Sequence, residues 1–383
     1  MKTAQVWEAT RGLPVRRLPG PRVQVRANRA ELDSWKTATP VPLPAAPSAE
    51  KQMSHTTWWL LFGSLAAVLV GAAGFAVGMG APALASAKIV DDALVGLDRE
   101  GMQLWRHAFA SLDAVPYKDG DRRLWVGNLD GDGQPDVLFV PIPHGFIRES
   151  VPLVRLDAQG HEIWRFTPGR SLRRGTQEFS PPYVVRQFAI IGDKVIVTSH
   201  HHLYYPSEVA VLDVRGRMVR SYYHPGHLNV LTTGTVQGNT VALLGGVNNL
   251  AHAATLVALD PARLDGAAII DDRPSFDGLA AGLEIARILF PRSCISRHDP
   301  YNVVINILAN PKEVIVHVQE ELSGTHASVQ YHLGPTLELA SVSLSDIFRS
   351  KHQQLRADRI LDHDADKDVL RLAALTRPAR RRK

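Results

Sequence analysis

The chain has 383 residues, one cysteine and a formal net charge of +5. The length accommodates two domains and a linker, and a lone cysteine excludes an intrachain disulfide, so an exported domain would be held together by packing alone. Residues 1–56 carry nine Lys/Arg and four acidic residues, which accounts for the whole net charge, so the remainder has no global basic field of the kind that indicates nucleic-acid binding.

Residues 1–36 combine a small apolar set with many cations. Thr3–Glu8, Gly12–Gly20 and Arg29–Trp35, with Val23, Val25 and Arg26, resemble the DNA-binding half of an excisionase/MerR-type winged helix-turn-helix domain. The resemblance implies a recognition helix over Thr3–Thr10, a wing hairpin from Leu13 to Arg26 and DNA as a partner. The DNA contacts would come from Gln5 to bases and from Arg11, Arg16, Arg17, Arg22 and Arg26 to phosphates.

This segment departs from the family at its start, because the family places another helix and a turn before the position of Thr3. We therefore expect either a true start upstream of Met1 or a truncated, decayed remnant, since ~36 residues alone are marginal for folding. The alternative is a partly ordered basic tail near anionic lipid headgroups. Residues 37–56, rich in Pro, Ala, Ser and Thr, predict a flexible, semi-extended linker.

Trp58–Gly78 is an uninterrupted apolar run of 21 residues without charge. At ~1.5 Å per residue this run spans the ~30 Å hydrocarbon core of a bilayer, so we predict a transmembrane helix over residues 57–80. The cationic flank places the N-terminus in the cytoplasm and residues 88–383 in the periplasm or outside the cell, in a single-pass protein of the bacterial inner membrane. The alternative is a cleaved signal peptide, for which Ala83–Ala87 offers small residues.

After Ala87 the sequence consists of short β-type runs separated by Gly, Asp and Pro. Their spacing favours an all-β, antiparallel architecture. The predicted strands are Lys88–Val90, Leu94–Leu97, Leu124–Val126, Val137–Val140, Val151–Leu156, Val184–Ile191, Lys194–Thr198, Val209–Leu212, Thr240–Leu244, Thr255–Leu259, Val303–Ile307 and Val314–Gln319.

An internal repeat consists of a strand ending in Leu-Asp, a Gly three residues after the Asp and, in two copies, a Trp seven residues after it. The copies are Asp98/Gly101/Trp105, Asp157/Gly160/Trp164, Asp213/Gly216 with Arg220 at the Trp position, and a fourth with only Asp260. The Asp residues are 59, 56 and 47 positions apart, of the order of propeller blades at ~40–50 residues plus insertions. We therefore predict a β-propeller-like domain over residues 88–342, with Trp105 and Trp164 packed between neighbouring sheets.

The segment Asn128–Asp136 places oxygen-bearing side chains at alternate positions with Gly between them. It resembles the calcium loop of FG-GAP-type propeller repeats, in which a strand follows the loop directly. Asn128 stands where that pattern has Asp, so weak Ca²⁺ binding is expected, and the alternative is an Asx-rich turn. The predicted ligands are Asn128, Asp130, Asp132, Asp136 and the carbonyl of Gln134. We do not assign a second site to Asp362, Asp364, Asp366 and Asp368, because this segment has no Gly and lies between helix-patterned stretches.

Two groups of histidines, His200–His202 and His224 with His227, invite a metal or acid–base interpretation together with Tyr204 and Tyr205. We expect them instead to be exposed loop or strand-end histidines. The chain contains no GxSxG, HExxH or P-loop spacing, so no enzymatic activity is predicted.

Residues 343–376 change to a helical period. Ser345 is expected to cap a helix with Ile347, Phe348, His352 and Leu355 on one face, and Asp366 to cap a second. Residues 377–383 are expected to be a basic, disordered end.

The sequence thus predicts a mainly β protein with a propeller-like exported domain, C-terminal helices, one transmembrane helix and a small winged-helix remnant. We interpret it as a non-enzymatic, membrane-anchored sensor or interaction protein whose exterior domain binds a ligand or protein partner. The alternative is an exported β-propeller enzyme acting on carbohydrate or a similar substrate.

Overall fold

The computed structural model describes the backbone of Arg16–Leu18 and Gln24–Arg26 together with residues 82–109, 112, 123–145, 148–322 and 326–379. The chain divides into the units Met1–Met79 and Gly80–Lys383. The predicted transmembrane helix over residues 57–80, the linker and the side chains of the predicted DNA contacts lie outside the described residues. Within the part that is described, none of the helices is both long enough and apolar enough for a membrane span.

The described part of the first unit is a pair of short strands. β1 (Arg16–Leu18) and β2 (Gln24–Arg26) are antiparallel, with Arg16 opposite Arg26. Both strands fall within the stretch predicted to form a hairpin.

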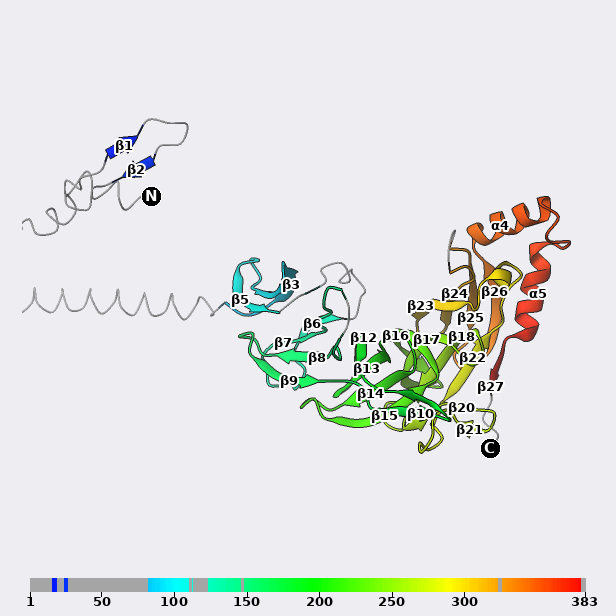
Figure 1. Cartoon of the computed structure of the whole chain (residues 1–383), viewed down its shortest axis with the longest axis horizontal. Helices are drawn as coiled ribbons and strands as arrows, with labels where there is room; N and C mark the ends of the chain where they lie inside the picture. Colours follow the sequence, from blue (N-terminus) through cyan, green and yellow to red (C-terminus); the bar gives the residue numbers. More distant parts are fainter. Residues whose placement is uncertain are drawn as a thin grey trace, which may run out of the picture. The chain divides into compact units, whose positions relative to one another are not determined.

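The second unit contains five consecutive antiparallel sheets (Figure 1). Sheet 1 consists of β3 (Ser86–Val90), β4 (Ala93–Leu97) and β5 (Gln103–Ala108). Sheet 2 consists of β6 (Leu124–Gly127), β7 (Asp136–Phe139), β8 (Leu153–Leu156) and β9 (Glu162–Phe166). Sheet 3 consists of β12 (Tyr183–Ile191), β13 (Lys194–His201), β14 (Ser207–Leu212) and β15 (Met218–His224), joined in parallel by the short β19 (Gly266–Ala267).

Sheet 4 consists of β16 (Gly226–Val236), β17 (Asn239–Asn248), β18 (Ala253–Leu259), β22 (Ala286–Phe290) and β27 (Arg377–Ala379). Sheet 5 consists of β23 (Val303–Ala309), β24 (Val314–Gln319), β25 (Ser328–Leu333) and β26 (Leu339–Leu344). Two small hairpins, β10 (Leu172–Arg174) with β11 (Gln177–Phe179) and β20 (Ile269–Ile270) with β21 (Arg273–Pro274), complete the strands.

All twelve runs predicted as strands overlap strands, and the mainly β architecture is confirmed. The regularity goes beyond the prediction, because sheets 2 to 5 each begin with four strands in sequence order. In sheet 4 a long excursion, residues 260–285, separates the third strand from the fourth.

The middle sheets are buried on both faces, which explains their nearly continuous apolar strands. In β7, Val137 and Phe139 pack toward sheet 1, whereas the intervening Leu138 packs toward sheet 3. In β17, Ala242 and Leu244 contact sheet 3, and Leu243 contacts sheet 5. This alternation follows from the period of two along a strand, and four core clusters thus join the five sheets in chain order.

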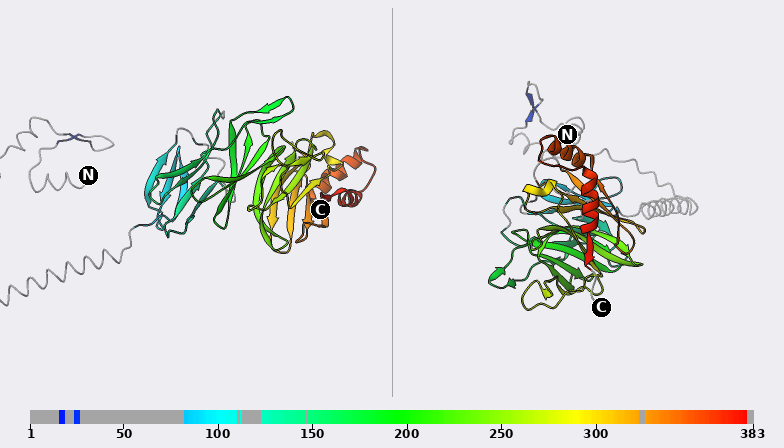
Figure 2. Two further views of the ribbon diagram at one scale, coloured as in Figure 1. Left: turned by 90° about the horizontal axis from the view of Figure 1, so that it is seen from below. Right: turned by 90° about the vertical axis from the view of Figure 1, so that its right-hand side faces the viewer.

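The described sheets do not form a closed ring. Among the described residues, each main core cluster joins sheets that are consecutive in the chain, and none joins sheet 1 to sheet 5. Figures 1 and 2 show these two sheets at opposite ends of the second unit. The architecture is therefore an open succession of sheets, rather than a closed propeller.

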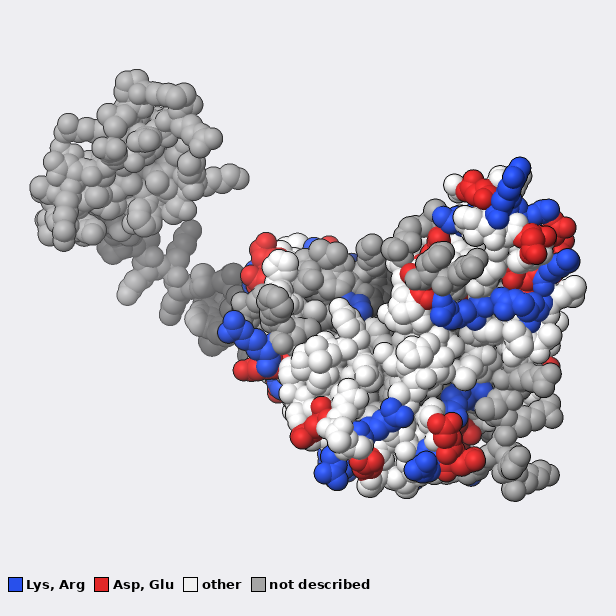
Figure 3. All heavy atoms as spheres, turned by 45° about the vertical axis from the view of Figure 1, so that its right-hand side comes forward, with Lys and Arg blue, Asp and Glu red and all other residues white. Residues whose placement is uncertain are grey.

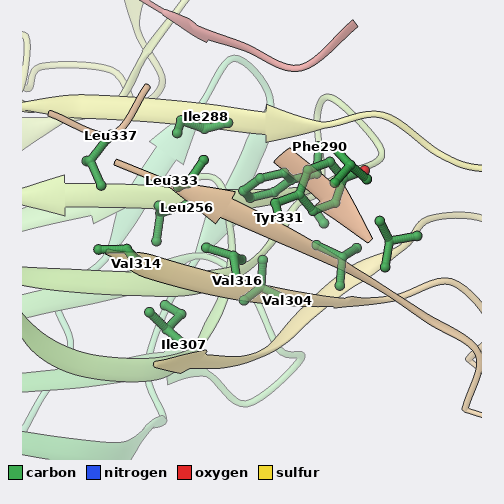
Figure 4. Packing of buried hydrophobic residues seen from close by; sticks show 14 of the residues in the cluster. Leu256, Ile288, Phe290, Val304, Ile307, Val314, Val316, Tyr331, Leu333 and Leu337 are labelled. Carbon is green, nitrogen blue, oxygen red and sulfur yellow. The ribbon is translucent and has the colours of Figure 1, made fainter. Parts of the chain in front are cut away.

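The largest core lies between sheets 4 and 5 (Figure 4). Leu256, Ile288 and Phe290 of sheet 4 face side chains of sheet 5, with the rings of Phe290 and Tyr331 4.5 Å apart. The same core includes Phe348 and Leu372, so the two C-terminal helices cover one of its ends.

These helices are α4 (Asp346–Ala357) and α5 (Ala365–Leu375). Ser345 caps α4 as predicted, with its side chain accepting from the backbone N–H of Phe348. β26 continues to Leu344, so the helical segment begins after residue 343, and α5 is preceded by Asp364 rather than Asp366. Arg377–Ala379 pairs with β22, so the prediction of disorder is wrong for these three residues, and residues 380–383 lie outside the described part.

The repeated Asp residues begin turns of one geometry. In the first three copies the Asp N–H donates to the carbonyl four residues later, and its own carbonyl accepts from the Gly N–H three residues later. The Asp side chain also accepts from a backbone N–H four residues on, at 2.7 Å for Asp98, 2.8 Å for Asp157 and 2.9 Å for Asp213. These side-chain bonds explain why Asp recurs at this position.

Each Trp of the repeat docks on the next copy's turn. Trp105 of sheet 1 donates its indole N–H to the carbonyl of Ala158 at 2.9 Å, and Trp164 of sheet 2 donates to Val214 at 3.0 Å. The rings lie over the turn glycines: a Cβ on Gly160 would lie 2.6 Å from Trp105, and one on Gly216 would lie 2.5 Å from Trp164. The Trp side chains thus connect consecutive sheets.

We predict that Gly216→Ala destabilises the protein more than Gly101→Ala. Both glycines have positive φ, +75° and +79°, so each alanine carries ~1–2 kcal/mol of backbone strain. Only Gly216 lies beneath an indole, so its alanine adds ~1–3 kcal/mol of overpacking. Urea unfolding of the two variants measures the difference, and equal losses of unfolding free energy would contradict the docking contact.

Candidate metal centre

Four potential metal ligands converge beside the C-terminal helices. Cys294 precedes the short 3₁₀ helix η1 (Ile295–His298), which follows β22. His352 lies one turn after Phe348 on the buried face of α4, and Asp368 lies one turn before Leu372 on the buried face of α5. His363 lies in the connection between these helices. Packing of the apolar helix faces on the sheet 4–5 core therefore brings the polar groups together.

The ligand atoms of these four residues all lie within 4.8 Å of one another. Asp368 Oδ2 is at their centre: it accepts from Cys294 Sγ at 2.7 Å and lies 3.2 Å from His363 Nε2 and 3.5 Å from His352 Nε2. Asp368 and His352 are each only 1% exposed. Nε2 of His352 makes no hydrogen bond to the described part of the protein, so a buried ring nitrogen faces this cluster with only the 3.5 Å contact to Asp368.

Further groups fix the orientation of the ligands. The other ring nitrogen of His363, Nδ1, lies 3.2 Å from Asp362 Oδ1, and the other carboxylate oxygen of Asp368 lies 3.3 Å from Arg371. Arg371 in turn donates to the carbonyl of Arg292 at 2.9 Å. A carboxylate on the remote nitrogen of a histidine is the usual outer-shell partner in metal sites, because it fixes the tautomer and the ring orientation.

The turn that carries Cys294 is anchored by a buried carboxylate, Glu320. Its two oxygens accept from the backbone N–H of Ser293 at 2.9 Å and from the side-chain amide of Asn302 at 3.0 Å, and it also accepts from the hydroxyl of Ser296. Glu320 follows β24 directly, so its hydrogen bonds attach this turn to sheet 5. The position of Cys294 is therefore set by a hydrogen-bonded network rather than by η1 alone.

The protonation of Cys294 argues against a cysteine nucleophile. Burial, together with the hydrogen bond to the Asp368 carboxylate, raises the pKa of the Cys294 thiol far above its usual range. A reactive cysteine requires an electropositive setting that lowers its pKa, and here the nearest acceptor is an anion. A bound cation would reverse this balance, because a coordinating thiol loses its proton.

The centre borders a pocket of about 690 Å³. Its lining combines Cys294, His363 and Asp368 with the cationic side chains of Arg292, Lys367 and Arg371. Figure 3 shows charged side chains gathered at the end of the molecule that carries α4 and α5, while the middle of this face is mainly uncharged. The pocket therefore borders three of the four ligands.

The predicted calcium loop connects β6 to β7, and most of its side-chain oxygens bond within the protein. Asn128, Asp130 and Asp132 accept from backbone N–H groups of the same loop. Arg155 of β8 pairs with Asp130 at 2.5 Å and Asp136 at 2.7 Å. The hydrogen bond from Arg155 lowers the pKa of Asp130. Calcium binding by Asn128, Asp130, Asp132, Gln134 and Asp136 stays a prediction, and an ion there would compete with this guanidinium.

The histidines of the two groups lie at strand ends or in a turn, as predicted, but of the five only His202 is exposed. His200 and His201 are each 4% exposed and His224 is fully buried, because they lie at inner strand ends of sheet 3. The rings of His200 and His227 are 4.6 Å apart, whereas His201 turns away and bonds to the carbonyl of Ser180. Burial lowers the pKa of His200 and of His224 to about 3 and that of His227 to about 4.

None of the four centre residues was among the predicted metal ligands. Asp368 was considered only with its acidic neighbours, and the structure instead groups it with a cysteine 74 positions away. The spacings from Cys294 to His352 and His363 match no short zinc motif. The one available signal was a histidine on the apolar face of a predicted helix, which more often marks a packed core position.

No family model and no curated protein matches this chain. Twelve chains among the solved structures do match. One is the crystal structure of the Pseudomonas aeruginosa PilY1 C-terminal domain, with 11% identity and a TM-score of 0.38 over 67% of this chain and 71% of that one. At this TM-score the likeness supports no functional inference.

We predict that His200, His224 and His227, whose pKa values are lowered by burial, make the protein acid-sensitive below pH 6.5. His200, His224 and His227 are neutral in the folded chain and have their ordinary pKa of ~6.5 when unfolded, so the unfolded state gains protons first as the pH falls. Each histidine then removes up to about 1.4 kcal/mol of unfolding free energy per pH unit, down to its folded pKa.

Urea unfolding at pH 7, 6 and 5 measures this slope. His227→Gln should make it shallower, because one proton-binding group is lost from the unfolded chain. His202→Gln, which replaces an exposed neighbour, should leave the slope unchanged. A slope equal in His227→Gln and the wild type would rule out this origin of the acid sensitivity.

Proposed function

We propose that the second unit is a binding module for a transition-metal ion, held by Cys294, His352, His363 and Asp368. The observation that carries this proposal is the convergence of four different ligand atoms within 4.8 Å at a largely buried point. Metal–ligand bonds of ~2.0–2.3 Å place tetrahedral ligands about 3.5 Å apart, so a small contraction of this cluster suffices. The donor set of one sulfur, two nitrogens and one oxygen suits Zn²⁺ and is unsuited to Ca²⁺ or Mg²⁺.

The ligand number supports binding rather than catalysis. Four protein ligands complete a tetrahedral shell, whereas catalytic zinc sites keep one position for water or substrate. Cys294 lies directly before η1, His352 lies in α4, and Asp368 lies in α5. His363 lies in the connection between these helices, so the ion would join both helices to sheet 4. This agrees with the sequence-based interpretation of a sensor without enzymatic activity, in which the metal ion is the ligand sensed.

Metal titration of the metal-depleted, full-length chain tests the proposal. We expect one Zn²⁺ or Co²⁺ per chain, and with Co²⁺ an absorption band from thiolate-to-metal charge transfer. An ion that binds only the folded state at 100 times its Kd raises the unfolding free energy by about 2.7 kcal/mol, so a chelator should lower the melting temperature.

Cys294→Ser should abolish the charge-transfer band, and His363→Ala should weaken Co²⁺ binding. His332→Gln is the matched control, because His332 also pairs with a carboxylate, Glu313 at 2.7 Å, but lies away from the four ligands. Absence of stoichiometric binding in the wild type would overturn the proposal. So would a charge-transfer band that persists in Cys294→Ser.

We also propose that the chain is anchored in the bacterial inner membrane through residues 57–80 with this module outside the cytoplasm. The uncharged run Trp58–Gly78 and its cationic N-terminal flank support this topology. Protease added to spheroplasts should then degrade the second unit and spare an N-terminal tag. Release of a soluble module with a new N-terminus near Lys88 would contradict a retained anchor.

The succession of sheets supports a propeller-type origin for the fold. Each consists of antiparallel strands in sequence order, and the Trp105 and Trp164 contacts join one sheet to the next, as expected between blades. We propose that sheets 1 to 5 are propeller-type blades in an open arrangement.

A further inference from the structure

The third copy of the repeat lacks the ring that its two predecessors dock on the following sheet. In the strand register Trp105 is opposite Gly96 and Trp164 is opposite Arg155, each two residues before the repeat Asp. Arg220 of β15 is opposite Val211 of β14, which lies two residues before Asp213. Arg220 therefore occupies in sheet 3 the position that the Trp residues occupy in sheets 1 and 2. The turn it would cover is the one after β18, which begins at Asp260.

A pocket of about 570 Å³ lies at this position. Arg220 and Val219 line it from sheet 3, and Asp260, Pro261 and Ala262 line it from the turn of sheet 4. Ile191 and Thr240 contribute further apolar and hydroxyl surface. An indole thus makes the contact between sheets 1 and 2 and the contact between sheets 2 and 3. Between sheets 3 and 4, a pocket lies where the third indole would be.

We propose that this pocket binds a planar aromatic ring of indole type, supplied by a small molecule or by the tryptophan of a partner protein. The ring would take the place that Trp105 and Trp164 occupy in the two preceding contacts. The volume lies in the ~300–1,000 Å³ range of ligand pockets. This proposal is independent of the metal centre.

The lining suits such a ring. Arg220 carries a planar guanidinium, which stacks on aromatic faces better than an ammonium does. Pro261 is buried and Val219 is 48% exposed, so one wall is fixed by the fold and the other offers apolar surface to an incoming ligand. Asp193 and Lys194, which also line the pocket, pair with each other at 2.7 Å, so this turn adds no uncompensated charge to the lining.

Photolabelling of the full-length chain with a diazirine-bearing indole tests the proposal. We expect labels on peptides containing Val219–Arg220 and Asp260–Ala262, and loss of these labels when free indole competes. A tryptophan-containing tripeptide competing more strongly than indole would identify a partner's side chain as the source, and the reverse order a small molecule.

Two variants fill the pocket from opposite walls. Arg220→Trp supplies the missing ring, so it should abolish labelling and raise the melting temperature. Ala262→Phe should abolish labelling from the other wall, and Arg106→Trp, which adds an indole to the exposed face of β5, should leave labelling unchanged. Labelling that persists in a folded filling variant, or that free indole does not reduce, would overturn the proposal.

Discussion

The contact between sheets 2 and 3 depends on one backbone carbonyl that receives two side chains from the preceding sheet. Val214 O accepts from the indole N–H of Trp164 at 3.0 Å and from the guanidinium of Arg155 at 2.9 Å. Arg155 also neutralises Asp130 and Asp136, so the loop before β7, the end of sheet 2 and the turn of sheet 3 meet at one largely buried cation. Because an unpaired buried charge is costly, these elements must assemble together where sheets 2 and 3 meet.

The sequence was sufficient to predict twelve of the strands, but not the remaining strands or the open arrangement of the sheets. Runs such as Val137–Val140 are apolar at every position because both faces of their sheet are buried. This pattern can be recognised in the sequence alone. Whether the last sheet returns to the first depends on small rotations at each contact, which no local pattern records. A turn with the same hydrogen bonds lies between β25 and β26 of sheet 5, and it was not predicted from the sequence for a local reason. Gly334 stands in place of Asp and Leu337, with φ +62°, in place of Gly, although the backbone hydrogen bonds are the same.

The candidate site was harder to predict than the fold, because its residues owe their proximity to packing. Phe348 and Leu372 place His352 and Asp368 near each other, and Glu320 places Cys294. These supporting residues lie in three separate parts of the sequence. Phe348 and Leu372 lie one helical turn from His352 and Asp368, a spacing that indicates a shared buried helix face but not a metal site. The repeat, by contrast, was visible because its Asp, Gly and Trp lie within eight consecutive residues.

The position of the single cysteine has a consequence for how this domain resists unfolding. Without a second cysteine it has no intrachain disulfide, yet Cys294 and Asp368 are 74 residues apart and would be tied by one ion. A tie across a loop of that length lowers the entropy of the unfolded chain by an amount worth about 4 kcal/mol if it acts like a covalent cross-link. The stability of this domain would then depend on the metal concentration in its compartment and not on the redox potential there.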